Sequence, residues 1–186
     1  MAVGDIASAT STAPDPNNPP VYNTRGGDRG GYISTTDTQN IVAFLAPSQF
    51  TGDDSGYYGG SLSFSLQDTV PSDPQNYPAV IIYSGGQAIS YSGPPPGTTW
   101  TAYSIPLTEA GWTIYPGGEQ NGTTPLTKAQ FKAILANVTA LAIEADWHTG
   151  ADNTGLDSVS LAGRVKTPVA APVEALHNRF AAAAAG

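Results

Sequence analysis

Carboxylate side chains are the residues of this sequence with the most obvious potential for catalysis. A glycosidase needs two carboxyl groups about 5–10 Å apart, and the acidic residues available for such a pair are Glu109, Glu119, Glu144 and Asp146. Spacing along the chain does not define that separation, and a solvated carboxylate is the ordinary alternative. The two histidines, His148 and His177, follow no nucleophile elbow. Gly59-Gly60 lacks the lysine and the helix of a phosphate loop. We therefore expect a protein without catalytic activity.

Aromatic side chains offer a second chemistry, the stacking of sugar rings. Their faces are apolar enough to pack on the C–H faces of sugars, while tyrosine and tryptophan also carry a polar group. The tryptophans are Trp100, Trp112 and Trp147, and Tyr57-Tyr58 is an adjacent pair. Trp112 fits a core position. The strand alternation of Trp147 points it inward, whereas its place at a strand end favours exposure. The candidate glycan-binding residues are Trp147, Tyr57 and Tyr58.

Composition excludes several classes of protein. The 186 residues include seven Lys plus Arg and fifteen Asp plus Glu, a formal net charge of −8. A nucleic-acid-binding protein needs clustered basic residues, and this chain has none. No apolar run reaches the roughly 20 residues of a membrane span. The absence of Cys excludes disulfides and thiolate metal sites. A content of 12% charged and 40% hydrophobic residues is not typical of disorder.

Short apolar or alternating runs predict β-strands through most of the chain. Leu62, Phe64 and Leu66 alternate with serines, which indicates a strand with one wet face. Residues 79–91 (AVIIYSGGQAISY) have the pattern of a β-hairpin. Similar runs lie at 41–45, 103–107, 141–147 and 159–161, separated by turns rich in Gly, Pro, Asn and Asp. This pattern predicts an all-β sandwich.

One segment has helical periodicity instead. Phe131, Ile134, Leu135 and Val138 share one face of a helix, and Thr127 with Gln130 forms a capping-box pattern. We predict a single short helix at about 127–138 that crosses an end of the sandwich.

Both ends of the chain are predicted to be extended arms. Residues 1–29 are rich in Pro and Gly, including Pro14, Pro16 and Pro19. Residues 164–186 are rich in Ala, and a short helix there would place Val173, Leu176 and Phe180 on one stripe. Such a helix is marginal alone in water, so it needs a surface of its own chain or of a neighbour. These residues are the candidate assembly contacts.

Several ordered motifs resemble the laminin B (laminin domain IV) family. They are APSQFTGD at 46–53 followed by YYGGSL at 57–62, the hairpin at 79–91, the segment from Trp100 to Trp112, and GLDSVSL at 155–161. The resemblance covers about residues 30–163. It implies a jelly-roll β-sandwich similar to carbohydrate-binding modules, with no known catalytic activity. The acidic stretch 143–146 (IEAD) departs from the family, because many relatives carry an Arg there.

The same resemblance suggests a structural calcium ion, which such modules often hold between the first and last strands. Calcium takes six to eight oxygen ligands. Asp37 near the start of the domain and Asp157 near its end occupy the matching positions. The alternative is turn chemistry, in which these side chains bond the local backbone. No other cofactor is expected.

The arms and the unusual N-terminus lead to the functional hypothesis. Residues 1–12 (MAVGDIASATST) lack the basic and apolar regions of a secretory signal. Arms that fold on a neighbour are a common means of joining an assembly. We therefore predict a phage capsid decoration protein on the virion surface, forming a homo-oligomer or part of an assembly with capsid subunits. The alternative is an extracellular glycan-binding or adhesion module whose signal peptide was removed.

Overall fold

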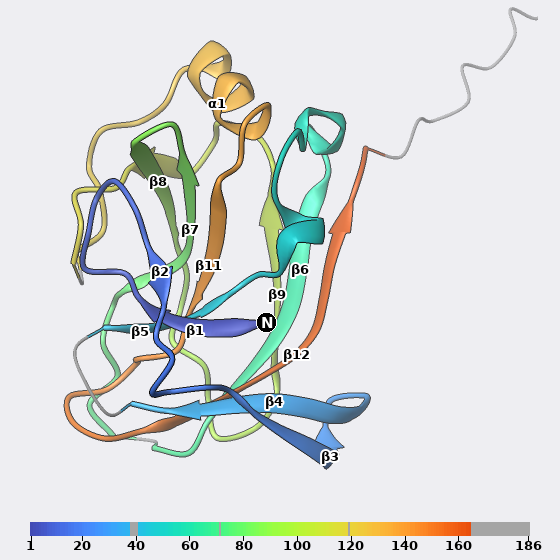
Figure 1. Ribbon diagram of the computed structural model, residues 1–186, viewed down its shortest axis with the longest axis vertical. Helices are drawn as coiled ribbons and strands as arrows, with labels where there is room; N and C mark the ends of the chain where they lie inside the picture. The colour runs from blue at the N-terminus through green and yellow to red at the C-terminus, as the bar shows by residue number, and fades with distance from the viewer. Residues whose placement is uncertain (38–40, 71, 119, 165–186) are drawn as a thin grey trace, which may run out of the picture.

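Two antiparallel β-sheets packed face to face make up the computed structural model, which describes residues 1–37, 41–70, 72–118 and 120–164 (Figure 1). The seven-stranded sheet has the order β10 (Trp112–Ile114), β8 (Gln87–Ser92), β7 (Pro78–Ser84), β11 (Ala140–Glu144), β5 (Val42–Leu45), β1 (Ala2–Asp5) and β2 (Ala13–Pro14). The five-stranded sheet has the order β3 (Val21–Gly27), β4 (Gly30–Thr36), β12 (Asn153–Ala162), β6 (Ser61–Asp68) and β9 (Thr101–Pro106). The predicted all-β sandwich is confirmed.

The core lies between the sheets and follows the alternation in the sequence. On β6, Leu62, Phe64 and Leu66 are buried while the serines between them face outward. The Phe64 ring stacks on Tyr103 of β9 with ring centroids 4.9 Å apart. All seven residues of β7 are buried, because this strand is covered on both faces. Short 3₁₀ turns at Ser48–Phe50 and Ser55–Tyr57 connect β5 to β6.

The predicted helix is α1 (Lys128–Leu135), which lies across one end of the sandwich, at the top of Figure 1. Its capping box between Thr127 and Gln130 forms as predicted. The helix ends three residues earlier than expected. The reason is that Val138 exchanges two backbone hydrogen bonds of 2.8 Å with Gly52, which a helical backbone could not make.

The N-terminal stretch differs from the extended arm that its composition suggested. Residues 1–29 contain three strands: β1 pairs with β5, β2 pairs with β1, and β3 pairs with β4. Between β1 and β2 the chain crosses the outer face of the seven-stranded sheet, where Ile6 is completely buried and its carbonyl oxygen accepts a 2.7 Å hydrogen bond from the Tyr115 hydroxyl. Backbone pairing and this burial hold the segment on its own domain.

The structure describes only some of the candidate assembly residues. Pro14 lies in β2, and Pro16 and Pro19 lie in the exposed connection to β3. Val173, Leu176 and Phe180, with the whole Ala-rich stretch from residue 165 onward, lie outside the described residues. Within the described part of the chain, no helix is long and apolar enough to cross a membrane.

Candidate functional site

The outer face of the five-stranded sheet is a polar surface made by the small side chains of three strands. Ser63 and Ser65 of β6 point outward because their neighbours fill the core. Ser160 of β12 lies opposite Ser63, and Asp157 lies opposite Ser65. A depression of about 240 Å³ opens here, lined in part by Asp28, Arg29, Ser63, Ser65, Ser158 and Ser160. Hydroxyl groups thus form much of its floor.

A bulge in β12 and the turn of the β3–β4 hairpin shape the walls of this depression. The register with β6 shifts between Asp157 and Ser160, and Ser158 has a left-handed φ of 57°, as expected for a β-bulge. The Asp157 carboxylate accepts hydrogen bonds from the backbone N–H groups of Ser158 (2.6 Å) and Arg29 (3.0 Å). The Ser65 hydroxyl donates to Asp28 at 2.9 Å. These bonds pin the hairpin turn over the sheet.

An aromatic pair lies on the same face, next to Gly155 of β12. The rings of Tyr32 (β4) and Trp100 (just before β9) meet edge to face, with centroids 5.2 Å apart. The Trp100 indole N–H donates to the carbonyl oxygen of Gly26 at 2.9 Å. A Cβ atom on Gly155 would lie 3.0 Å from Trp100 and 3.1 Å from Tyr32. The missing side chain therefore lets both rings lie directly on the strand, and both remain partly exposed.

This combination of groups suits a carbohydrate. Sugar hydroxyls both donate and accept hydrogen bonds, as do the serine hydroxyls here, and aromatic rings provide an apolar surface with a polar edge. A larger depression of about 400 Å³ lies beside β1, with Leu45, Ala46 and Pro47 in its lining. Neither an aromatic ring nor a charged side chain lines it, so it offers fewer groups that would orient a ligand.

Two of the three predicted glycan-binding residues lie elsewhere, and the third is inaccessible. Trp147 is fully buried and donates its indole N–H to the carbonyl oxygen of Glu144 at 3.2 Å, so it presents no face to a sugar. Its place at a strand end suggested exposure, but the side chain follows the alternation of β11 into the core. Trp112 is also buried, as predicted.

Tyr57 and Tyr58 lie near α1 rather than on the polar face. The Tyr58 hydroxyl donates to Glu109 at 2.8 Å, and the ammonium groups of Lys132 and Lys128 lie 4.5 and 5.5 Å from the Tyr58 ring centroid. These lysines compete with a sugar for the ring. Tyr57 packs partly against the core. Tyr32 and Trp100 do lie together. The alternating serines of residues 61–65 indicate the solvent-facing side of this sheet, but no local pattern in the sequence pairs the two rings.

The two candidate calcium ligands are not brought together. Asp37 follows the end of β4 and its backbone N–H donates to the carbonyl oxygen of Asp152 at 3.1 Å. Asp157 lies five positions further along β12, a separation of roughly 16 Å in an extended strand. The pairing of β4 with β12 therefore places Asp37 and Asp157 near opposite ends of β4, which gives no support to a calcium site shared between them. Among the described residues, no three His, Asp or Glu side chains are grouped to hold a metal.

Of the described acidic residues weighed as a glycosidase pair, Glu109 lies near α1, whereas Glu144 and Asp146 are buried neighbours at the end of β11. Glu144 is buried on the face covered by the N-terminal segment, and burial raises the pKa of its carboxyl group well above the usual range. The pKa of Glu109 is lowered, first by a hydrogen bond from its own backbone and then by Tyr58. His148 is buried, and Glu119 and His177 lie outside the described residues.

The two packed sheets, with aromatic rings and hydroxyls on one polar face, define a jelly-roll β-sandwich of the type found in carbohydrate-binding modules. Solved structures show the same fold. The L4b domain of human laminin alpha-2 is 18% identical with a TM-score of 0.68, over 89% of this chain and 92% of that one. The family 11 carbohydrate-binding module of Clostridium thermocellum Lic26A-Cel5E is 14% identical with a TM-score of 0.51, over 90% and 99%.

The sequence places the chain more narrowly. The model of the Laminin B (Domain IV) family matches residues 43–175, more than half of the chain. The protein belongs to the laminin B (domain IV) family. A comparison with curated proteins found no match. Laminin B domains and carbohydrate-binding modules are in general non-catalytic binding domains.

Proposed function

We propose that this protein is a non-catalytic, extracellular module that binds a glycan on the outer face of its five-stranded sheet. The observation that supports this most is the Tyr32–Trp100 pair lying on Gly155 beside the serine-lined depression. A sugar ring stacks on the aromatic pair, and its hydroxyls bond the serines and the Asp28–Arg29 turn. Such a division between an apolar platform and a few orienting polar groups is typical of ligand sites.

The fold comparison adds support for a glycan as ligand. A family 11 carbohydrate-binding module from Clostridium thermocellum, 15% identical with a TM-score of 0.50 over 90% of this chain and 99% of that one, was solved with a β-1,3-1,4-mixed-linked tetrasaccharide. The depression here carries one guanidinium group (Arg29) and one carboxylate (Asp28), and its other polar groups are mainly uncharged serine hydroxyls. We therefore favour a neutral polysaccharide over an anionic one, since the net charge of −8 repels polyanions.

The capsid decoration hypothesis has less support. Its basis was the two arms and the N-terminus without a secretory signal, and the N-terminal segment pairs with β5 of its own chain. The similar structures named above are laminin and carbohydrate-binding domains, not virion proteins. Homo-oligomerisation stays a prediction.

The test is a titration of the protein with soluble polysaccharides, including a mixed-linkage β-glucan, followed by amide chemical shifts and by calorimetry. Shifts are expected at Tyr32, Trp100 and Ser160. Trp100→Ala should weaken binding about tenfold, because loss of a stacked ring costs on the order of 1.4 kcal/mol. Tyr58→Ala, which removes a partly exposed ring near α1, is the matched control and should bind normally.

Trp100→Ala also removes the hydrogen bond to Gly26 and can therefore disturb the β3–β4 hairpin. A second variant that leaves this bond in place controls for that effect. Ser160→Arg places a large side chain over the depression from an exposed position and should also block binding. No response to any polysaccharide, or a loss in Tyr58→Ala alone, would show that the proposed site is wrong.

A further inference from the structure

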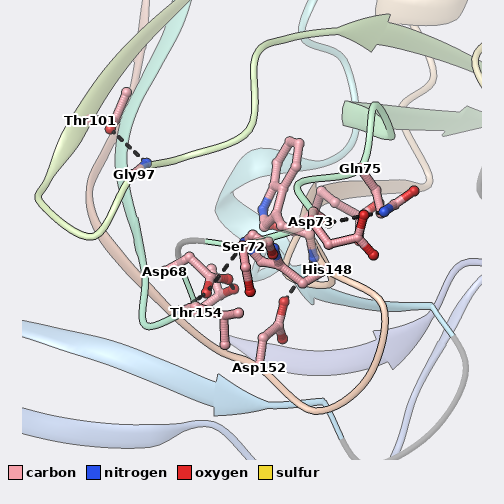
Figure 2. A network of polar contacts seen from close by, with 12 residues as sticks. Asp68, Ser72, Asp73, Gln75, Gly97, Thr101, His148, Asp152 and Thr154 are labelled. Carbon is pink, nitrogen blue, oxygen red and sulfur yellow. Dashed lines mark hydrogen bonds and ion pairs between the residues drawn. The ribbon is translucent and has the colours of Figure 1, made fainter.

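Buried ionisable side chains gather at the end of the sandwich where β6 and β11 finish and β12 begins (Figure 2). Asp68 is completely buried, and His148, Asp152 and Asp146 are each no more than 6% exposed. Asp152 and His148 belong to the loop of residues 145–152, which we call the β11–β12 loop. Burying several carboxyl groups together is costly unless some are neutral.

Hydrogen bonding accounts for three of the four oxygens on Asp68 and Asp152. One oxygen of Asp68 accepts from the Val70 N–H at 2.7 Å, and the other from the Thr154 hydroxyl at 2.8 Å. Oδ2 of Asp152 accepts from the Trp147 N–H at 2.9 Å. Oδ1 of Asp152 is buried and has no N–H or O–H donor. The bond left to it is one with the Asp68 carboxyl group, and two carboxylates cannot form it without a proton.

Among the described residues, the groups around this pair provide no fixed positive charge. The β11–β12 loop contributes Asp146 and His148, the segment after β6 contributes exposed Asp73, and Asp37 after β4 donates its backbone N–H to the Asp152 carbonyl. The imidazole Nδ1 of His148 bonds the carbonyl oxygen of Ser72, and its Nε2 lies 3.8 Å from Asp68. That contact is an ion pair only when the imidazole is protonated. Glu144 lies nearby on the other face of β11.

Basic residues lie on other elements of the described chain. Arg25 and Arg29 belong to the β3–β4 hairpin, Lys128 and Lys132 to α1, and Arg164 follows β12. With no arginine or lysine to balance them, two carboxylates at Asp68 and Asp152 would repel each other across a buried contact, where charges are weakly screened.

We propose that Asp68 and Asp152 share one proton, and that this proton holds the β11–β12 loop closed, so that the loop opens when the proton is lost at raised pH. The loop is the element affected because Asp152 bonds the Trp147 N–H within it, and the fully buried Trp147 side chain fixes it to the core. Repulsion between the two carboxylates therefore acts directly on the hydrogen bond between the Trp147 N–H and Asp152.

The surroundings of Asp152 support the same conclusion. Burial, followed by the neighbouring Asp68 carboxyl group, raises the pKa of Asp152 to about 8. The opposing contribution is the hydrogen bond from the Trp147 N–H, which stabilises the carboxylate. The shared proton is therefore held at neutral pH and lost in mildly alkaline solution.

Carboxyl carbon chemical shifts of the ligand-free protein test the shared proton. The carboxyl carbon of Asp152 is expected to titrate with a midpoint near 8. A midpoint below about 5, the range of ordinary aspartates, would overturn the proposal because both groups would then be ionised at neutral pH. This measurement needs no variant and no ligand.

Hydrogen exchange at the Trp147 amide tests the loop. After correction for the intrinsic rate, its protection should fall about tenfold between pH 7 and pH 9.5, since one pKa unit corresponds to a tenfold change. Asp152→Asn keeps an acceptor for the Trp147 N–H and carries a permanent N–H donor toward Asp68, so its protection should stay constant. Asp53→Asn removes an exposed carboxylate elsewhere and should behave like the parent.

Each outcome decides the proposal. Constant protection in the parent protein, or an equal fall in Asp152→Asn, contradicts it. If Asp152→Asn does not fold, Asp68→Asn replaces it, because an asparagine there can donate to Asp152 in the same way.

Discussion

Gly155 and Trp100 are in direct contact across the outer face of the five-stranded sheet, and a Cβ atom on the glycine would lie 3.0 Å from the indole ring. Gly155 lies in β12, whereas Trp100 lies just before β9, 55 positions earlier in the sequence. Their contact places the one partly exposed tryptophan on the same face of the sheet as the hydroxyl-lined depression. The proposed glycan site depends on this one close approach.

Replacing Gly155 by alanine is the first test of that approach. The added methyl group would press on both Trp100 and Tyr32, so the rings must move or the strand must shift. We expect a loss of about 1–3 kcal/mol in the free energy of unfolding, the usual cost of overpacking, together with weaker polysaccharide binding. Urea unfolding and calorimetry measure the two effects. Gly56→Ala, at an exposed position with open space and no left-handed φ, controls for the loss of a glycine. Normal binding by Gly155→Ala would exclude the contact from the site.

The pH dependence of stability follows from carboxyl groups whose pKa is raised in the folded protein. Asp152 has a pKa of about 8 and Glu144 one well above its usual range, both chiefly because of burial. The folded protein then binds more protons than the unfolded chain at pH values between about 4 and 8. Its stabilisation is complete below pH 4 for these two groups and is lost as the pH rises toward 8. Urea midpoints should therefore decrease from pH 5 to pH 8.5.

The variant Glu144→Gln separates the contribution of Glu144 to this pH dependence from that of Asp152. Oε1 of Glu144 accepts the backbone N–H groups of Ala145 and Asp146 at 3.1 Å each, and Oε2 is buried without a partner. A glutamine keeps the first two bonds and carries no charge at any pH. We expect unchanged stability at pH 5, within about 0.5 kcal/mol, and greater stability than the parent at pH 8.5. A variant that is less stable than the parent at pH 8.5 would mean that Glu144 is stabilising as a carboxylate.

The N-terminal segment should contribute to stability rather than only to association. Ile6 is completely buried against the outer face of the seven-stranded sheet, in a cluster with Ile81, Tyr83 and Tyr115. Ile6→Ala should cost about 2–5 kcal/mol, as large-to-small core substitutions do. Pro16→Ala, in the exposed connection that follows β2, should change stability by less than about 0.5 kcal/mol. Thermal unfolding of both variants measures this, and equal stability would restore the idea of a free arm.

Helix capping offers a local check on α1. The Thr127 side chain accepts from the Gln130 backbone N–H, and the Gln130 side chain accepts from the Thr127 backbone N–H. Thr127→Ala removes the cap and should cost about 1 kcal/mol. Lys128→Ala, at the next and exposed position, should cost little. A Thr127→Ala variant as stable as the parent would show that α1 is held by its buried face alone.

Periodicity in the sequence was sufficient for the main strands and for the helix. Residues 61–66 alternate strictly, and β6 buries Leu62, Phe64 and Leu66 as predicted, while the β3–β4 turn also covers Ser65. Residues 131–135 have helical spacing, and α1 buries Phe131, Ile134 and Leu135. In both cases the signal is carried by neighbouring residues, so no knowledge of distant partners is needed. The four residues of β1 are too few to show a period, so the Pro- and Gly-rich composition predicts an arm there.

Only the tertiary structure decided the candidate site. Tyr32 and Trp100 are 68 positions apart in the sequence, and they meet because β4, β12, β6 and β9 lie side by side in one register. The same register separates Asp37 from Asp157 and brings Asp152 to Asp68. The sequence by itself determined the family, the all-β class and the inward or outward face of the regular strands, because these depend on local patterns. Hydrogen bonds between strands that are distant in the sequence decide which outward-facing residues come together in one site. No local pattern encodes that pairing.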